Sequence, residues 1–252
     1  MGAQGFVTLA RHFPDRTVVT FDPRGAERSR RTDGATESTP DEHTDDLHRL
    51  ISALDTGPVD IFATSGGAVN ALALVARHPE QVRTLVAHEP PTAQVLPDRE
   101  QVLAACVDIH ETYLRTGLGP AMAKFITLVS YEGPLPADYA EARTRSSDIR
   151  APDRGRRLSG HPLVGQNMPS GNAYQPDFDA LRAAPTRVLI AVGAESARAT
   201  AGRAATAIAE RPGTTPVIFP GGHTGFLGGE YGQTGEPDAF ADTLRRVLGS
   251  EG

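Results

Sequence analysis

A chain of 252 residues is long enough for one large domain or two small ones. Its composition, with 39% hydrophobic and 22% charged residues, is typical of a protein with a packed core. Because 31 acidic residues outnumber 25 basic ones and leave a net charge of −6, we expect no binding to nucleic acid or to anionic membranes. The apolar runs are far shorter than the ~20 residues that span a bilayer, and the single cysteine, Cys106, excludes an intramolecular disulfide or a multi-cysteine metal site. We therefore expect a cytoplasmic globular protein without a signal peptide.

In the N-terminal part of the chain, short β-branched runs alternate with patterns typical of helices. A helix should begin at Thr39, a good N-cap that is followed by Pro40 and by acidic residues near the positive end of the helix dipole. Its apolar residues keep a helical spacing, and Gly57 and Pro58 should end it. The other elements predicted in this part are helices over residues 7–13 and 66–77 and strands over residues 17–21, 59–63 and 84–87.

The pattern breaks between residues 92 and 184 and then resumes. In the middle, helices are predicted over residues 99–115, 119–130 and 137–147, followed by a Gly-, Pro- and Arg-rich stretch over 151–176. Beyond it, strands are predicted over 187–192 and 216–219, and helices over 199–211 and 237–248. This alternation predicts an α/β protein with a parallel sheet covered on both faces. We assign residues 1–91 and 185–252 to the core and 92–184 to a helical insertion over one edge of the sheet.

Ser65 lies where a predicted strand turns directly into a helix, in the segment Phe-Ala-Thr-Ser-Gly-Gly over residues 62–67. A small-x-Ser-x-Gly pattern in such a turn pushes the serine out at the carboxyl end of the strand. The amide of Gly66 and the helix dipole then face any oxyanion formed there. The alternative interpretation is a serine N-cap in a Gly-rich turn. A phosphate-binding loop is disfavoured because neither a Lys-Ser/Thr pair nor a GxGxxG motif is present.

His223 lies in a Gly-rich loop directly after the last predicted strand. Because the carboxyl ends of parallel strands meet at one edge of the sheet, this loop should place His223 on the same rim as Ser65. The simpler alternative is a loop histidine that caps a backbone group. Most of the other histidines should lie on helix surfaces or in loops, while His161, in the insertion, is a candidate for lining a substrate pocket.

Together these motifs resemble the α/β-hydrolase family. Residues 22–29 are similar to its D-x-R-G-x-G-x-S loop, with Glu27 where glycine is usual. Ser65 resembles the nucleophile of the family's elbow, with Ala63 in place of the first glycine, and His223 resembles the general base. The resemblance covers essentially the whole chain outside the insertion, which is similar in placement to the family's helical cap. It implies an α/β-hydrolase fold and a catalytic triad, without a cofactor or metal.

The resemblance leaves two candidates for the acid of the triad. Glu195 follows the penultimate strand, where most of the family carries its acid, but the usual aspartate position is occupied by Ser196. Glu89 ends the strand after the elbow helix, from which haloalkane dehalogenases and zearalenone-type lactone hydrolases take their acid. The stretch from Ser65 to Glu89 is similar to the elbow and acid region of these lactone hydrolases. Either carboxylate would hold the tautomer of His223 and stabilise its imidazolium; we favour Glu89 and keep Glu195 as the alternative.

The resemblance also implies a strand before Met1 that ends in a His-Gly-like turn and supplies a second oxyanion amide. That strand would lie between those predicted over residues 17–21 and 59–63. We therefore expect a hydrolase core that lacks its N-terminal strands, whose absence would leave a central gap in the sheet. Three interpretations stay open: Met1 is an internal start of a longer natural protein, the two flanking strands close up, or the chain folds poorly. One lost oxyanion donor typically costs ~10²–10³ in turnover.

The implied activity is that of a serine hydrolase that cleaves a small-molecule carboxylic ester or lactone through an acyl-enzyme on Ser65, with Gly66 N–H binding the oxyanion. A cofactor-free haloperoxidase, a carbon–carbon bond hydrolase with the same triad, and a non-catalytic binding protein of this fold stay as alternatives. Whether the protein forms a homodimer stays open. The candidates for substrate binding are Tyr113, Phe125, Tyr131 and His161, although the helical spacing of the apolar residues also fits a cap core.

Overall fold

The computed structural model describes residues 1–140, 161–211 and 213–249. Its sheet is built from β1 (Val59–Thr64), β2 (Val82–His88), β3 (Arg187–Gly193) and β4 (Val217–Phe219), which lie side by side in this order. Each neighbouring pair is parallel, with Thr64 opposite His88 and His88 opposite Ala191. The carboxyl ends of β1 and β2 therefore lie at one edge of the sheet, as the alternating pattern predicted.

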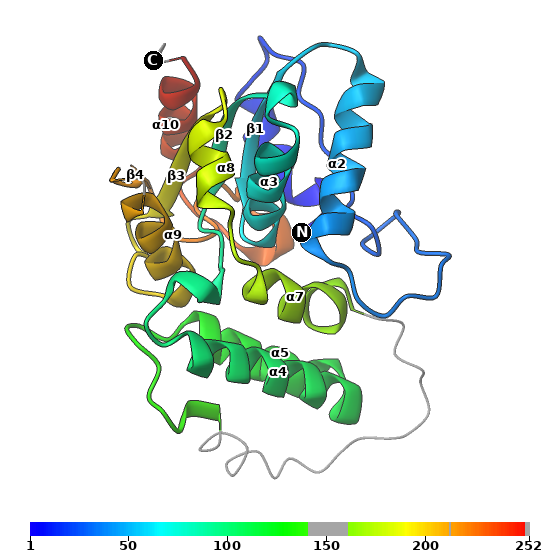
Figure 1. Ribbon diagram of the computed structural model, residues 1–252, viewed down its shortest axis with the longest axis vertical. Helices are drawn as coiled ribbons and strands as arrows, with labels where there is room; N and C mark the ends of the chain where they lie inside the picture. The colour runs from blue at the N-terminus through cyan, green and yellow to red at the C-terminus, as the bar shows by residue number, and fades with distance from the viewer. Residues whose placement is uncertain (141–160, 212, 250–252) are drawn as a thin grey trace.

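Helices cover both faces of this sheet (Figure 1). Since successive residues of a strand point to opposite faces, Leu85 and Ala87 of β2 pack in one apolar cluster and Val86 packs in another. The first cluster contains residues of α2, α3, α8 and α9, and the second contains residues of α1 and α10. The bounds of these helices are α1 (Val7–Arg11), α2 (Pro40–Leu54), α3 (Gly66–Arg77), α8 (Phe178–Ala183), α9 (Thr200–Glu210) and α10 (Pro237–Gly249). Short 3-10 turns lie at η1 (Ala3–Phe6), η2 (Pro79–Gln81), η3 (Ala93–Val95) and η5 (Glu230–Gly232).

The start of α2 confirms the predicted N-cap. The hydroxyl of Thr39 accepts a hydrogen bond from the backbone N–H of Glu42 at 3.2 Å, and the Glu42 carboxylate accepts the backbone N–H of Thr39 at 2.9 Å. This reciprocal pair is a capping box, and it satisfies amides that the helix itself leaves without partners.

We expect Thr39→Ala to lower the free energy of unfolding by about 1 kcal/mol, because the N-terminal amide of Glu42 loses its acceptor. Urea unfolding followed by circular dichroism measures this change. Thr39→Ser is the matched control, since it keeps the hydroxyl and should stay within about 0.5 kcal/mol of the wild type. Equal stability of the alanine and serine variants would contradict the assigned cap.

The insertion forms a helical layer at one end of the sheet (Figure 1). Its helices are α4 (Arg99–Thr116), α5 (Leu118–Val129) and α7 (Met168–Ala173), the last preceded by a π-helical turn, η4 (Pro162–Asn167). They share an apolar cluster that includes Cys106, Ile109 and Leu128. Residues 141–147 of the third predicted cap helix and residues 151–160 of the Gly-rich stretch lie outside the described residues. No helix in the described part of the chain is both long and apolar enough to cross a membrane.

Residues 17–21 do not form the predicted strand, and this prediction is wrong. No strand of the described residues pairs with them, and Val18 and Val19 are 45% and 46% exposed. β-Branched residues form a strand only where a neighbouring strand pairs with their backbone N–H and C=O groups and packs against their side chains. Arg16, just before this segment, forms an ion pair with Asp60 of the edge strand β1 at 3.2 Å, but no backbone pairing follows. Among the described residues the sheet therefore has four strands and begins at β1, which agrees with the reduced core expected above.

Candidate active site

Ser65 occupies the turn between the last residue of β1 and the first residue of α3. Its backbone angles, φ 56° and ψ −134°, lie in a region that residues other than glycine rarely adopt, so the chain reverses sharply here. The N–H of Ser65 donates to the carbonyl of His88 at 2.9 Å, which ties this turn to the end of β2. Ser65 occupies the N-cap position of α3, as the alternative interpretation has it, but its side chain makes no capping hydrogen bond to the helix.

Gly66 and Gly67 begin α3 and leave open space beside Ser65. Apart from the adjacent residues and the nearby backbone of the helix, no atom lies within 4 Å of a Cβ added to either glycine. A larger side chain would therefore not be excluded here by crowding. The N–H groups in the first turn of a helix have no partner within the helix and form the positive end of its dipole. The amide of Gly66 is therefore suited to bind a negatively charged oxygen next to Ser65.

Glu89 is the first residue after β2, and its side chain pairs with His223. Glu89 is 0% exposed and has a φ of 48°, in the left-handed region. Its Oε2 lies 2.5 Å from Nδ1 of His223; because a carboxylate only accepts, this contact requires the proton on Nδ1. Its Oε1 accepts the backbone N–H of Gly193 at 2.8 Å and the hydroxyl of Ser196. The His223 side chain is 39% exposed, so the buried carboxylate holds an imidazole that stays accessible.

The surroundings of Glu89 favour its ionised form. Burial alone would raise the pKa of this carboxyl, but its hydrogen bond to His223 and the charge of that residue hold the pKa below its usual value. The neighbouring His88 is also fully buried, and burial lowers its pKa to about 4. The ring of His88 lies 6.1 Å from that of His223. A neutral His88 therefore lies beside the Glu89–His223 pair without adding a charge.

The buried His88 should make stability depend on pH. Its pKa falls from an ordinary 6.5 to about 4, so between these values the unfolded chain binds more protons than the folded one. We expect the free energy of unfolding to fall as the pH is lowered through this window, by up to about 1.4 kcal/mol per pH unit from this residue. Urea unfolding from pH 7 to pH 4 measures the slope, and His88→Phe should reduce it. His43, whose pKa burial also lowers, stays in both proteins, so an unchanged slope in the variant would contradict the prediction.

The family model described as alpha/beta hydrolase fold matches residues 3–230. The chain belongs to the α/β-hydrolase family. It is 31% identical over 231 residues to an uncharacterized hydrolase, YraK, of Bacillus subtilis (strain 168), and the alignment covers 89% of this chain and 79% of YraK. Among solved structures it is similar to MGS-M2, an α/β-hydrolase enzyme from a Medee basin deep-sea metagenome library, with a TM-score of 0.68 and 16% identity over 100% of this chain and 86% of that one. It is also similar to a thermophilic esterase from Thermogutta terrifontis, with a TM-score of 0.63 and 20% identity over 98% of this chain and 85% of that one.

In this α/β-hydrolase, Glu195 does not take the place of Glu89. Glu195 is exposed on the loop after β3, and its carboxylate lies beside Gly222, next in sequence to His223. Among the described residues, Glu89 is hydrogen-bonded to Nδ1 of His223 and Glu195 is not. The structure thus brings Glu89 and His223 together and leaves Glu195 in solvent, which favours Glu89 as the acid.

The aromatic candidates in the cap of the hydrolase lie mainly in its core. Tyr113 is 2% exposed, and Phe125 and Tyr131 pack against the same apolar cluster. The hydroxyl of Tyr113 accepts the backbone N–H of His161 at 2.8 Å. Nδ1 of His161 is buried and has no hydrogen-bond partner within the described part of the chain. Contact of these four side chains with a substrate stays a prediction.

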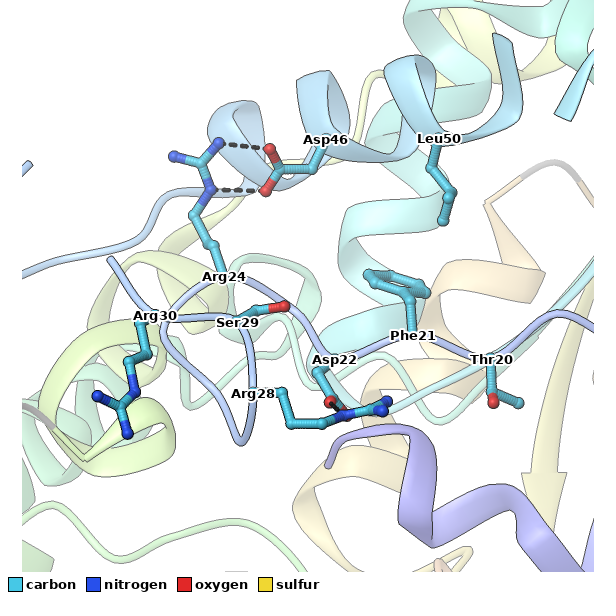
Figure 2. A pocket seen from close by; sticks show the side chains of 9 residues that line it. All are labelled: Thr20, Phe21, Asp22, Arg24, Arg28, Ser29, Arg30, Asp46 and Leu50. Carbon is cyan, nitrogen blue, oxygen red and sulfur yellow. Dashed lines mark hydrogen bonds and ion pairs between the residues drawn. The ribbon is translucent and has the colours of Figure 1, made fainter. Parts of the chain in front are cut away.

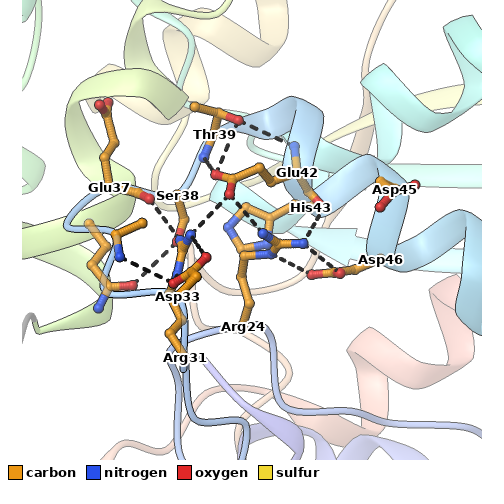
Figure 3. A network of polar contacts seen from close by, with 12 residues as sticks. Arg24, Arg31, Asp33, Glu37, Ser38, Thr39, Glu42, His43, Asp45 and Asp46 are labelled. Atoms are coloured by element: carbon orange, nitrogen blue, oxygen red, sulfur yellow. Dashed lines mark hydrogen bonds and ion pairs between the residues drawn. The ribbon is translucent and has the colours of Figure 1, made fainter.

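The D-x-R-G-like loop of the hydrolase is held against α2 by a network of ion pairs that the sequence did not predict (Figure 3). Nε and Nη2 of Arg24 each lie 2.7 Å from an oxygen of Asp46, and the guanidinium also binds Glu42. The Arg31 side chain, only 8% exposed, pairs with Asp33 at 2.7 Å and with Glu42 at 3.0 Å. The acidic residues in the first turns of α2 were predicted to interact with the helix dipole. In the structure they also bind two arginines.

The same region joins the core of the hydrolase to its cap. The backbone N–H of Ser38 donates to the carbonyl of Gln166 at 3.1 Å, and Nε2 of His43 lies 2.8 Å from Oδ1 of Asn167. These bonds connect residues before and within α2 to η4, more than 120 residues later in the chain. Neither Gln166 nor Asn167 carried a local signal, because a hydrogen bond between such distant segments has no spacing that the sequence reveals.

A cavity of about 560 Å³ opens beside this loop (Figure 2). In its wall, the buried Asp22 accepts the backbone N–H of Ala3 at 2.8 Å and binds Arg28 at 2.7 Å. The lining residues are Thr20, Phe21, Asp22, Arg24, Arg28, Ser29, Arg30, Asp46 and Leu50, and none of them is a candidate of the Ser65–Glu89–His223 site. No group of three or more His, Cys, Asp or Glu side chains in the described residues could hold a metal ion.

Proposed function

We propose that the protein is a serine hydrolase that cleaves a carboxylic ester or lactone through an acyl-enzyme on Ser65. The observation that carries this proposal is the pairing of a strained serine turn with a buried carboxylate–imidazole pair at the same edge of the sheet. The backbone contact between Ser65 and His88 fixes the turn to the residue that precedes Glu89. A serine, a histidine and a carboxylate arranged along one edge are the parts that acyl transfer requires.

In the proposed reaction, Ser65 Oγ attacks the carbonyl carbon while Nε2 of His223 takes the hydroxyl proton. The Gly66 N–H and the positive end of α3 stabilise the oxyanion of the tetrahedral intermediate. When this intermediate collapses, the bond from the acyl carbon to the leaving oxygen breaks and His223 returns its proton to the alcohol. Water then attacks the acyl-enzyme by the same route and regenerates Ser65.

Glu89 remains ionised throughout this cycle. Its negative charge stabilises the imidazolium, and its contact with Nδ1 leaves Nε2 unprotonated and ready to accept the proton of Ser65. In the proposal the cap covers this edge, with its turn η4 bonded to the core through Ser38 and His43. An apolar roof excludes water and selects the acyl and alcohol parts of the substrate.

Labelling with a fluorophosphonate tests the proposal. We expect the folded wild-type protein to react in one-to-one ratio and the label to lie on Ser65, identified by peptide mass spectrometry, because the probe reports a serine activated by a base. Ser130, the C-cap of α5, provides a matched control: Ser130→Ala should label like the wild type, whereas Ser65→Ala should not label. Absence of labelling in a folded sample would favour a binding protein over an enzyme.

A further inference from the structure

Ser196 lies in the turn after β3, and its side chain reaches a residue 107 positions away in the sequence. The turn is closed by a hydrogen bond from the backbone N–H of Ser196 to the carbonyl of Gly193 at 3.2 Å. The Ser196 hydroxyl donates to Oε1 of Glu89, the same oxygen that accepts the N–H of Gly193 at 2.8 Å. Two donors from one turn therefore bind the carboxylate oxygen that does not bind His223.

The Ser196 hydroxyl lies close to Gly193, at a tight junction between two loops. A Cβ on Gly193 would lie 2.7 Å from Ser196 Oγ and 2.8 Å from the carbonyl oxygen of Gly221, so the loops after β3 and β4 approach closely. The N–H of Glu195 donates to the same carbonyl of Gly221 at 3.0 Å. The loop with Ser196 and the loop leading to His223 are thus fixed to each other, with the Glu89 carboxylate between them.

A buried carboxylate needs such donors for two reasons. Glu89 is 0% exposed, so no water replaces a missing hydrogen bond, and a buried carboxylate with an unsatisfied oxygen becomes protonated or turns away. Moreover, the direction of a carboxylate is set by the donors on both oxygens. With Gly193 and Ser196 on Oε1, Oε2 is left facing Nδ1 of His223.

We propose that Ser196 is a positioning residue of the active site, which holds the Glu89 carboxylate in the rotamer that orients His223. The inference rests on the proposed function and adds to it a residue that touches neither the substrate nor His223. Its hydroxyl proton stays on Ser196 throughout, so the residue acts only through Glu89. Its effect should consequently disappear when Glu89 no longer carries a charge.

The test compares Ser196→Ala with Ser196→Thr, which keeps the hydroxyl. For Ser196→Ala we expect kcat for p-nitrophenyl butyrate to fall about tenfold with KM within about twofold, since one hydrogen bond to a charged group is lost. The acid limb of the pH profile of kcat/KM should move to higher pH, because a carboxylate with one donor fewer binds the imidazolium proton more strongly. Other titratable groups beside His223 and its loop include His88, Glu195 and Glu236, and all three are unchanged in these variants. Ser196→Thr should keep kcat and the pH profile within about twofold of the wild type.

A double-variant cycle separates positioning from a merely structural role. In the Glu89→Gln background, adding Ser196→Ala should change kcat by less than about twofold, because a neutral amide in any orientation supplies no negative charge to stabilise the imidazolium. The same loss in both backgrounds would overturn the proposal, as would a wild-type kcat and pH profile in Ser196→Ala. Circular dichroism and urea unfolding establish that each variant is folded.

Proton NMR separates this inference from the proposed function itself. The Nδ1–H of His223 bonded to Glu89 should give a downfield signal that is absent in Glu89→Gln, shifted in Ser196→Ala and retained in Ser196→Thr. If the wild type turns over no ester while these changes occur, the hydrolase proposal fails and the positioning role stands. If Ser196→Ala leaves the signal unchanged, the positioning role fails whatever the activity.

Discussion

Ser65→Ala should lower the turnover of p-nitrophenyl acetate by about 10⁴–10⁶-fold while the protein stays folded. The loss is large because no covalent intermediate can form without the serine oxygen, and the remaining groups act as a unit only with it. Residual hydrolysis should not depend on the ionisation of His223, so its rate should rise smoothly with pH as in water. Steady-state kinetics of the purified variant, next to the wild type prepared in parallel, measure this effect.

Ser65→Gly is the informative companion to that variant. A φ of 56° with a ψ of −134° costs a residue with a Cβ about 1–3 kcal/mol, and glycine relieves this strain. We therefore expect the glycine variant to be inactive and yet more stable to urea than Ser65→Ala. Turnover near the wild-type level in either variant would remove Ser65 as the nucleophile, and equal stability of the two would show that the turn is not strained.

The sequence predicted best those elements whose signals are local. Helix α3 was predicted with its observed bounds, because the turn at Ser65 precedes it and the break at His78 and Pro79 follows it. The N-cap of α2 was equally readable, since Thr39 and Glu42 are three residues apart and bind each other. In both cases the residues that define the boundary are neighbours in the chain.

Predictions failed where the outcome depends on a distant partner. Residues 17–21 have the composition of a strand, but a strand also needs a neighbour, and no residue within 17–21 reports whether one is present. Helix α7 was missed because Pro169 and Gly171 lie within it, residues that argue against a helix from local propensity alone. Packing of Met168 in the cap cluster outweighs this preference.

The acid of the triad stayed ambiguous in the sequence for the same reason. Glu89 and Glu195 both follow a strand of the sheet, and their distances from the Gly-rich loop of His223 depend on how β2, β3 and β4 align. The structure contains a further clue, since Ser196 stands where most of the family carries its acid and binds Glu89. A hydroxyl at that position is compatible with a carboxylate supplied from the end of β2.

Glu89→Gln should therefore reduce kcat by about 10³–10⁴-fold, while Glu195→Gln, its matched control, should stay within about twofold of the wild type. In the glutamine variant, Oε1 can still accept from Gly193 and Ser196, so the amide nitrogen faces His223. An amide N–H there donates to Nδ1 and moves the ring proton to Nε2, where it cannot take the proton of Ser65.

The two glutamine variants differ only in which carboxylate is neutralised, so the comparison assigns the acid directly. Both variants should be folded under the conditions of the kinetic assay, and circular dichroism verifies this. A large loss in Glu195→Gln with a mild one in Glu89→Gln would mean that the loop after β3 moves Glu195 to His223 during catalysis. Mild losses in both variants would mean that His223 is oriented without a carboxylate, and the triad as proposed would then be wrong.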